Sequence, residues 1–306
     1  MSGPLNDPMS GPISGMRYAL LDNRGLLAVG GADSRAFLQG LVSNDVNKVS
    51  SARAIWAALL TPQGKFLHEF FIVEIAGALV LDCEAARLPD LKRRLSLYKL
   101  RAQVTIEDRS NDFAVAALFG EGALAALGLT AEAGAARADD GGAVFADPRF
   151  AAVGARAIVP RATVRETLAR RGFAEAGAEA YDRARIVLGL PDGSRDLEIE
   201  KAILLENGFD ELNGVAWDKG CYMGQELTAR TKYRGLIKKR LMPVSIAGPI
   251  PAPGTPVTAN GEDAGEMRSS AAGVGLALLR LERLGGGPLN AGGATLTPIK
   301  PDWAKF

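Results

Sequence analysis

The chain has 306 residues, which is too long for one small domain and long enough for two or three. A hydrophobic content of 47% and a charged content of 23% are typical of a globular protein with a substantial core. Thirty-six basic and thirty-five acidic residues nearly cancel, so the total charge does not indicate a nucleic-acid-binding protein.

The first third of the chain predicts strands followed by helices. Residues 1–15 are rich in Gly, Pro and Ser and lack the apolar region of a secretory signal, so we expect a disordered tail. Apolar runs between turn residues predict strands, and apolar residues at helical spacing predict helices. We expect strands on both sides of the turn at 22–25, a helix capped at 33–35 and ending at 41, strands over 54–60, 65–73 and 78–83, and a helix over 88–97.

A second unit begins near Asp112, and the texture changes again after Arg240. We expect a strand over 113–119, a short helix over 122–127, a surface excursion over 131–143, strands over 143–146 and 155–159, and helices over 161–171 and 179–188. Frequent Pro and Gly after Arg240 punctuate short apolar runs and predict a small β-barrel. The pattern therefore predicts an α+β protein with a tail at 1–15, units at 16–111 and 112–240, and a barrel at 241–306.

Membrane insertion is excluded by the same pattern. The longest apolar stretch, 66–83, is interrupted by His68, Glu69, Glu74 and Asp82. We therefore expect no membrane partner.

The only cysteines are Cys83 and Cys221, and the only histidine is His68. Two cysteines form no disulfide framework, so we expect a reducing cytoplasmic location. This inventory cannot build an ordinary zinc site or hold an iron–sulfur cluster with four thiolates from one chain. Any cluster would be shared with a partner, a second copy or small thiols such as glutathione.

Cys221 lies in the most informative stretch of the chain, Lys-Gly-Cys-Tyr-Met-Gly-Gln-Glu at 219–226. Good helix formers follow Gly224, so we expect a helix to begin there. The positive end of that helix and the Lys219 ammonium both favour the thiolate form of Cys221. The alternative is a buried cysteine that only packs. Glycines on both sides and polar neighbours favour a functional thiol.

The octet is the signature of YgfZ-type relatives of the glycine-cleavage T-protein, folate-binding-like proteins that support iron–sulfur cluster assembly. Residues 213–215, 227–230 and 235–241 most resemble the mitochondrial branch of that family. Upstream, 37–46 resembles the N-terminal motif of the family and 62–65 its next motif. The resemblance implies two interlocked α+β units and a C-terminal barrel around a central hole where folate would lie.

The resemblance also implies a function, the assembly or repair of 4Fe–4S clusters, with Cys221 as a transient shared ligand. The partners would be A-type iron–sulfur carriers and client enzymes, and no nucleic acid. Lys219 and Arg230 would support the thiolate, while Gln225 and Glu226 would fix the loop. A tetrahydrofolate-type ligand would contact a further set of residues: Asn44, Asp45, Gln63, Lys65, Tyr222 and Arg230.

Two alternatives remain, a folate-dependent aminomethyltransferase or demethylase and a ligand-free scaffold in which Cys221 only packs. In the transferases a segment resembling Gly-Gly-x-x-Asp-Asp supplies an acid for the folate nitrogen, where this chain has His68-Glu69. The T-protein pattern places a pterin-reading glutamate at Val187, and a valine cannot accept those hydrogen bonds. These departures favour an assembly factor over a transferase.

Two further groups of residues allow two interpretations each. Aromatic residues near the thiol, Trp217, Tyr222 and Tyr233, either line a slot for a ring or pack in the core. A set of cations gives the middle of the chain a basic bias, which indicates either a solvated face or recognition of a polyglutamyl tail or an acidic partner. These cations are Arg183, Arg185, Arg230, Arg234, Lys238, Lys239 and Arg240.

Overall fold

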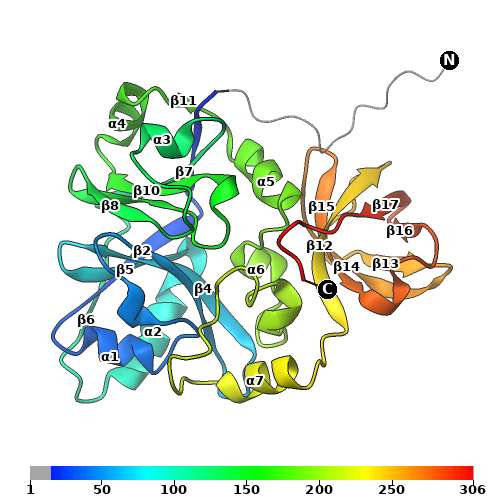
Figure 1. Ribbon diagram of the computed structural model, residues 1–306, viewed down its shortest axis with the longest axis horizontal. Helices are drawn as coiled ribbons and strands as arrows, with labels where there is room; N and C mark the ends of the chain where they lie inside the picture. Colours follow the sequence, from blue (N-terminus) through cyan, green and yellow to red (C-terminus); the bar gives the residue numbers. More distant parts are fainter. Residues whose placement is uncertain (1–14, 306) are drawn as a thin grey trace.

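The computed structural model describes residues 15–305, so the predicted tail lies outside the described residues except for Gly15. The described chain forms two sheets packed on each other, helices on their outer sides, and a closed barrel to one side (Figure 1). The predicted α+β class with a C-terminal barrel is confirmed. No helix within residues 15–305 is long and apolar enough to cross a membrane.

The first sheet is antiparallel and lies inside the molecule. Its outer face packs Phe70 against Leu38 and Leu91 of two covering helices, and its inner face turns Trp56 and Phe71 toward the second sheet. Burial on both faces explains why these strands are continuous apolar runs. The covering helices are α1 (Ser34–Gln39) and α2 (Leu88–Lys99). The strand order is β3 (Ile55–Leu60), β4 (Phe66–Ile75), β5 (Ala78–Glu84), β2 (Arg24–Gly30) and β6 (Thr105–Asp108).

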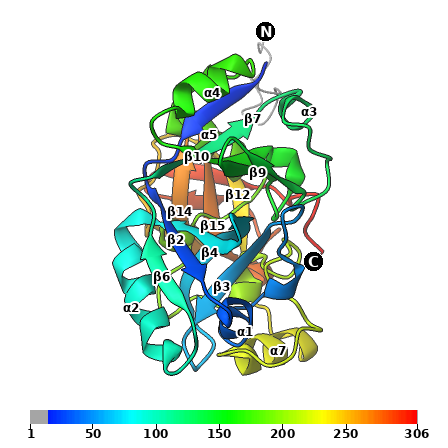
Figure 2. The ribbon, with the colours of Figure 1, turned by 90° about the vertical axis from the view of Figure 1, so that its left-hand side faces the viewer.

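The second sheet covers the inner face of the first, with Phe119, Phe145 and Ile158 at the contact. Two helices cover the outer face of this sheet, α3 (Ala123–Ala126) and α4 (Val164–Arg170). Leu127, directly after α3, and Leu168, within α4, pack on that face. Figure 2 shows α4 at the top, the sheets in the middle, and α1 and α2 at the bottom. The strand order is β11 (Ala174–Glu175), β1 (Arg17–Leu20), β7 (Phe113–Phe119), β10 (Ala155–Pro160), β9 (Gly142–Ala146) and β8 (Ala136–Asp139).

The structure bears on several local predictions. The strands predicted on both sides of the turn at 22–25 are present as β1 and β2, which belong to different sheets, because β1 pairs with β7 and β2 pairs with β5. The predicted surface excursion at 131–143 contains β8, which pairs with β9 although its Ala- and Gly-rich sequence carries little strand signal. Asp33 does not cap α1, because its carboxylate accepts a hydrogen bond from Gln103 N at 2.7 Å instead. The division at residue 112 stays a prediction.

Charged side chains buried between the sheets hold them together. Arg24 donates to Asp82 and to Glu69, each at 2.6 Å, and Arg156 donates to Asp82 at 2.8 Å. Trp56 Nε1 donates to the other oxygen of Glu69 at 2.6 Å. Buried charges are tolerated when they are paired in this way. We call this cluster the inter-sheet ion network, and its members are Arg24, Glu69, Asp82, Asp147, Arg149 and Arg156.

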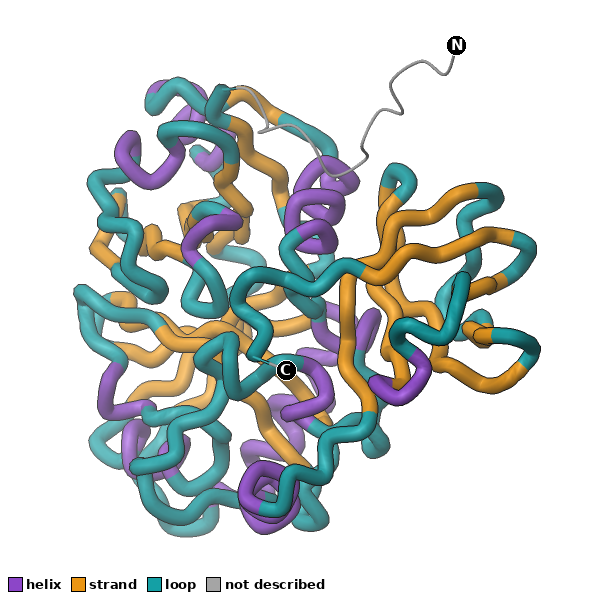
Figure 3. Tube along the Cα trace, turned by 45° about the vertical axis from the view of Figure 1, so that its right-hand side comes forward, coloured by secondary structure: helices purple, strands orange, loops and turns teal. Residues whose placement is uncertain are grey.

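Two helices, α5 (Ala178–Val187) and α6 (Gly193–Asp196), lie between the sheets and the barrel (Figure 1). Arg185 on α5 donates to Asp196 at 2.8 Å and to Ser269 of the barrel at 2.9 Å. After the barrel the chain returns toward the sheets (Figure 3), where Trp303 Nε1 donates to Leu188 O at 2.7 Å. The barrel order is β12 (Lys239–Ala247), β15 (Val274–Arg280), β14 (Glu262–Ala271), β13 (Pro256–Ala259), β16 (Leu289–Ala291) and β17 (Ala294–Pro298). Single 3-10 turns are η1 (Val46–Lys48), η2 (Ala85–Arg87), η3 (Ala151–Val153), η4 (Leu204–Asn207) and η5 (Leu281–Arg283).

Candidate functional site

Two motifs that lie far apart in the sequence form one unit in space. Ser43 Oγ donates to Gly214 O at 2.6 Å, and Asn44 Nδ2 donates to Asn213 O at 2.7 Å. A little further along, Met223 N donates to Gly40 O at 3.1 Å. These hydrogen bonds from the segment after α1 therefore hold the loop that carries Cys221 in place.

Lys219 completes this junction. Its ammonium nitrogen lies 2.7 Å from Gln39 O, 2.6 Å from Val42 O and 2.9 Å from Asn44 O. An ammonium group has three N–H donors, so all of them are used by these carbonyls. Burial lowers the pKa of Lys219 to about 8, and Asp45 opposes this shift. The ammonium of Lys219 is thus directed to the loop at 39–44, and it donates no hydrogen bond to the Cys221 sulfur.

The helix predicted after Gly224 is present as α7 (Gln225–Tyr233), with Gly224 at φ 80°. Tyr222 N donates to Gln225 Oε1 at 3.1 Å, so Gln225 fixes the loop as expected. The side chain of Glu226 instead pairs with Arg230 one turn along α7. This pair lies on the helix and does not fix the loop at 219–223. A Cβ on Gly64 would lie 2.6 Å from Gly224 O, so the β3–β4 turn touches the start of α7 at a position where only glycine fits.

Cys221 is exposed, whereas Cys83 is buried. The thiol lies at the edge of a hollow of about 300 Å³, which we call the thiol hollow. A Cβ built on Gly220 would meet no atom within 4 Å, so the space beside the sulfur is open as the flanking glycines suggested. The largest side chains that line the thiol hollow are Trp217, Tyr222 and Tyr233.

The three aromatic residues take different positions there. Tyr222 is buried in the core, where burial raises its pKa to about 12. Tyr233 is 75% exposed and meets the half-buried Trp217 edge-on, with ring centroids 6.1 Å apart. Trp217 Nε1 donates to Asp210 at 2.7 Å, and the Lys232 ammonium lies 4.1 Å from the centre of the indole. Tyr222 therefore packs, while Trp217 and Tyr233 present rings at the surface.

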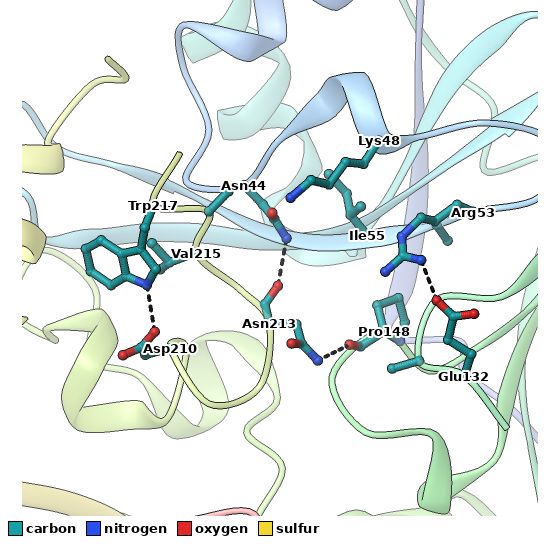
Figure 4. A pocket seen from close by; sticks show the side chains of 13 residues that line it. Asn44, Lys48, Arg53, Ile55, Glu132, Pro148, Asp210, Asn213, Val215 and Trp217 are labelled. Carbon is teal, nitrogen blue, oxygen red and sulfur yellow. Dashed lines mark hydrogen bonds and ion pairs between the residues drawn. The ribbon is translucent and has the colours of Figure 1, made fainter. Parts of the chain in front are cut away.

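A second concavity, the central pocket, lies on the other side of Trp217 and has a volume of about 450 Å³ (Figure 4). Asn44 and Asn213 lie side by side in it, and Asn213 takes the left-handed backbone conformation at φ 58°, which asparagine tolerates. Trp56, whose carbonyl accepts a hydrogen bond from Asn44, stacks on Phe209 with ring centroids 3.8 Å apart. The charged and amide side chains that line the central pocket are those of Asn44, Lys48, Arg53, Glu132, Asp210 and Asn213.

The structure does not bring all the predicted ligand-binding residues to this pocket. Asn44 lines it, and Asp45 accepts hydrogen bonds from Asn47 N and Gln39 Nε2 beside it. Gln63 and Lys65 lie in the β3–β4 turn against the start of α7, and neither lines the central pocket. Tyr222 and Arg230 also do not line it.

The positions that the sequence analysis compared with transferase residues lie elsewhere too. On β4, His68 faces α2 and its Nε2 lies 3.0 Å from Asp90, whereas Glu69 points into the inter-sheet ion network. Val187 packs beside Leu241 and Leu276 at the contact with the barrel. None of these three residues lines the central pocket.

Several residues of the central pocket had no signal in the sequence. Arg53 pairs with Glu132 at 2.6 Å across the pocket, and Asp210 accepts hydrogen bonds from Trp217 and Lys232. Arg53, Glu132 and Asp210 come from three distant segments and carry no local spacing pattern. Of the other residues of the pocket, Asn44, Asn213 and Trp217 belong to stretches that the sequence analysis singled out.

The fold is that of the glycine-cleavage T-protein. The chain superposes on the glycine cleavage system aminomethyltransferase T from Bartonella henselae with a TM-score of 0.76, at 15% identity, covering 95% of this chain and 87% of that one. Residues 238–306 match the family described as CAF17, C-terminal beta-barrel domain.

Sequence comparison gives the particular family. The chain is 34% identical to "Iron-sulfur cluster assembly factor IBA57, mitochondrial" of Mus musculus, over 96% of this chain and 87% of that protein. The human protein of the same name is 35% identical over 97% of this chain and 88% of its own length. The chain belongs to the IBA57 family.

The predicted cytoplasmic location is wrong by this comparison, because these relatives are named as mitochondrial. The prediction rested on the absence of a disulfide framework. That absence argues only against an oxidising compartment and does not distinguish one reducing compartment from another.

Proposed function

We propose that this protein is an iron–sulfur cluster assembly factor that holds a cluster, as cargo, between Cys221 and thiolates of a partner protein. The observation that carries the proposal is the position of Cys221, exposed at the edge of an open hollow in a member of the IBA57 family. A cysteine in this position can bind iron without any rearrangement of the core.

The inventory of ligands supports a shared cluster. Cys83 is 1% exposed and His68 is 2% exposed, so neither reaches a cluster at the surface. Within residues 15–305 no group of three or more His, Cys, Asp or Glu side chains is arranged to hold a metal ion. A cluster usually has four protein ligands, so a partner must supply those that Cys221 does not. A-type carriers would be the donors, and client enzymes with 4Fe–4S clusters the recipients.

The contacts of Lys219 support a positioning role for this residue. Its ammonium ties the loop at 219–223 to the backbone at 39–44, which sets where Cys221 lies. Lys219 therefore acts on the thiol through the loop. Arg230, paired with Glu226 on the exposed side of α7, is a surface residue of the same region.

Tetrahydrofolate fits the central pocket poorly. A pterin ring presents donors that a free carboxylate would accept, and both carboxylates on the described lining are already engaged, Glu132 by Arg53 and Asp210 by Trp217 and Lys232. Asn44 Nδ2 is used by Trp56 O and Asn213 O. We assign folate no step in cluster assembly and expect weak binding at most.

A transferase function is disfavoured for the same reason. Proton transfer in catalysis needs an acid within hydrogen-bond reach of the reacting nitrogen. Glu69 is 2% exposed and is bound by Arg24 and Trp56, so it cannot serve a ligand in the central pocket. The thiol remains the group on which a function can be built.

The test uses the cluster as its own reporter. The protein is mixed anaerobically with a cluster-loaded A-type carrier, and iron–sulfur absorbance is followed by gel filtration. We expect a coloured complex with the wild type and with Cys83→Ala, no complex with Cys221→Ser, and no stable cluster on the protein alone. A complex that forms equally with Cys221→Ser would overturn the proposal.

A further inference from the structure

The surface of α7 and the residues after it carries features that the fold does not use. Residues 232–236 are exposed in one continuous run, and among them Tyr233 is 75% and Leu236 is 48% exposed. Large apolar side chains that gather at the surface mark interaction sites more often than chance exposure does. Cys221 opens onto the same surface, because Tyr233 and the thiol line one hollow.

Tyr233 has the position of an interface residue. It lines the thiol hollow on one side and a shallow groove along α7 with Glu226, Arg230 and Arg234 on the other. Trp217 supports its ring edge-on, which limits the freedom that Tyr233 would lose on binding. Exposed Tyr and Trp rings next to a hollow are the residue types on which binding energy concentrates.

The charges around this surface do not cancel. Arg230 is paired with Glu226, and Lys232 is paired with Asp210. Arg234 and Lys238 are exposed, and neither has a carboxylate partner among the residues that the structure describes. The exposed run that follows α7 therefore keeps an excess of positive charge close in the chain to the exposed ring of Tyr233.

We propose that this surface, formed beside Cys221 by Trp217, Arg230, Tyr233, Arg234 and Lys238, docks a protein partner with an acidic face, which places an apolar side chain in the thiol hollow. This inference rests on the proposed function and names the surface and the chemistry of the partner. The unpaired cations select carboxylates, and the Trp217–Tyr233 pair receives the apolar side chain.

The size of the surface indicates a transient complex. A stable interface buries about 800 Å² on each partner, with 20–30 residues a side, and short-lived transfer complexes are smaller. A patch centred on one short helix belongs to the smaller class. Such a partner can leave once the cluster has been passed on.

The test separates docking from cluster binding. A cluster-free A-type carrier is titrated against the full chain by calorimetry at two salt concentrations, and the coloured complex is measured in parallel with the cluster-loaded carrier. We expect the double variant Arg234→Glu/Lys238→Glu to weaken both at least about tenfold and to remove most of the salt dependence. Tyr233→Ala should weaken the affinity about tenfold at both salt concentrations.

Two controls bear on the interpretation. Lys92→Glu/Arg101→Glu reverses two exposed charges at α2, which lies apart from α7 in Figure 2, and should bind within about twofold of the wild type. Cys221→Ser should keep the affinity for the cluster-free carrier while losing the coloured complex. If Arg234→Glu/Lys238→Glu binds like the wild type in both measurements, the partner docks at another surface and the proposal is overturned. A coloured complex that survives in Cys221→Ser would sink the proposed function while leaving the docking surface standing.

Discussion

Glu69 and Cys221 belong to regions that treat reactive groups in opposite ways. Glu69, which the sequence analysis compared with the acid of the transferases, is enclosed in the inter-sheet ion network by Arg24 and Trp56. Cys221 lies at the surface, on a loop held in place by backbone contacts to the segment at 39–44. The same fold therefore uses one reactive group as a structural joint between its sheets and leaves the other accessible at the surface. The location of a residue in the fold, more than its type, therefore decides its chemistry here.

The largest expected contrast is between the two thiols. Burial raises the pKa of Cys83, which lies in β5, so its sulfur reacts only after local or global opening. With a stability of about 5 kcal/mol or more, the open state is rarer than about one in a thousand. We expect iodoacetamide to label Cys221 at least about a thousandfold faster than Cys83 at neutral pH, as measured by peptide mass spectrometry. Comparable rates would mean that β5 opens easily or that Cys221 is shielded.

The inter-sheet ion network is the next largest test. In the wild type the Arg156 guanidinium pairs with Asp82 and lies 3.8 Å from the centre of the Phe71 ring. Arg156→Met removes this partner of Asp82 and leaves the network with one buried negative charge in excess. Breaking a buried ion pair on one side costs about 3–5 kcal/mol. Urea unfolding should show this loss, whereas Arg165→Met, in an exposed pair with Glu175, should change stability by less than about 1 kcal/mol. Equal losses in both variants would contradict the structural role of the network.

These contrasts show which features the sequence could predict. Strands β2 to β5 of the first sheet, the start of α7 and the barrel follow from apolar runs, a glycine before helix formers and dense turn residues. The short strands β6, β8 and β11 could not be predicted, because their pairing depends on neighbours from distant parts of the chain. Local propensity is weak where tertiary context decides.

The candidate site divides along the same line. The octet predicted an open loop and a helix after it, because those features depend on adjacent residues. It did not predict that the ammonium of Lys219 donates to the carbonyls of Gln39, Val42 and Asn44. Those carbonyls belong to a segment far earlier in the chain, and Gln39 lies 180 residues before Lys219. The structure also places Gln63 and Lys65 away from the central pocket, which the sequence could not show because motif order does not give side-chain direction.

A third test uses pH on the face of β4 opposite Glu69. Burial and the Arg87 charge lower the pKa of His68 to about 4, although Asp90 opposes the shift. The imidazole of the unfolded chain takes up its proton near pH 6.5. Above that pH His68 is neutral in both states, so it adds no pH dependence to the free energy of unfolding. Between pH 6.5 and 4 the unfolded state binds more protons, and the free energy of unfolding should fall by about 3 kcal/mol.

The matching variant isolates this contribution. His68→Gln keeps a donor toward Asp90 and cannot titrate, so its stability should change less over the same pH window. Urea unfolding at pH 7 and at pH 4.5 measures the difference. The same pH dependence in both proteins would assign the loss to other groups. The pKa of Asp90 is lowered, so its own contribution is lost only below its unfolded pKa of about 3.9, outside this window.

The smallest effect separates two roles for Lys219. If its ammonium clamps the loop, Lys219→Met leaves three carbonyls without a donor and should cost about 1–3 kcal/mol in urea unfolding. The loop would then be looser, and iodoacetamide should label Cys221 as fast as in the wild type or faster. If the ammonium instead activates the thiol, stability should hardly change while labelling slows about tenfold. Lys219→Arg keeps the charge but not the compact geometry, so under the clamp it should also lose stability, whereas under direct activation it should label like the wild type.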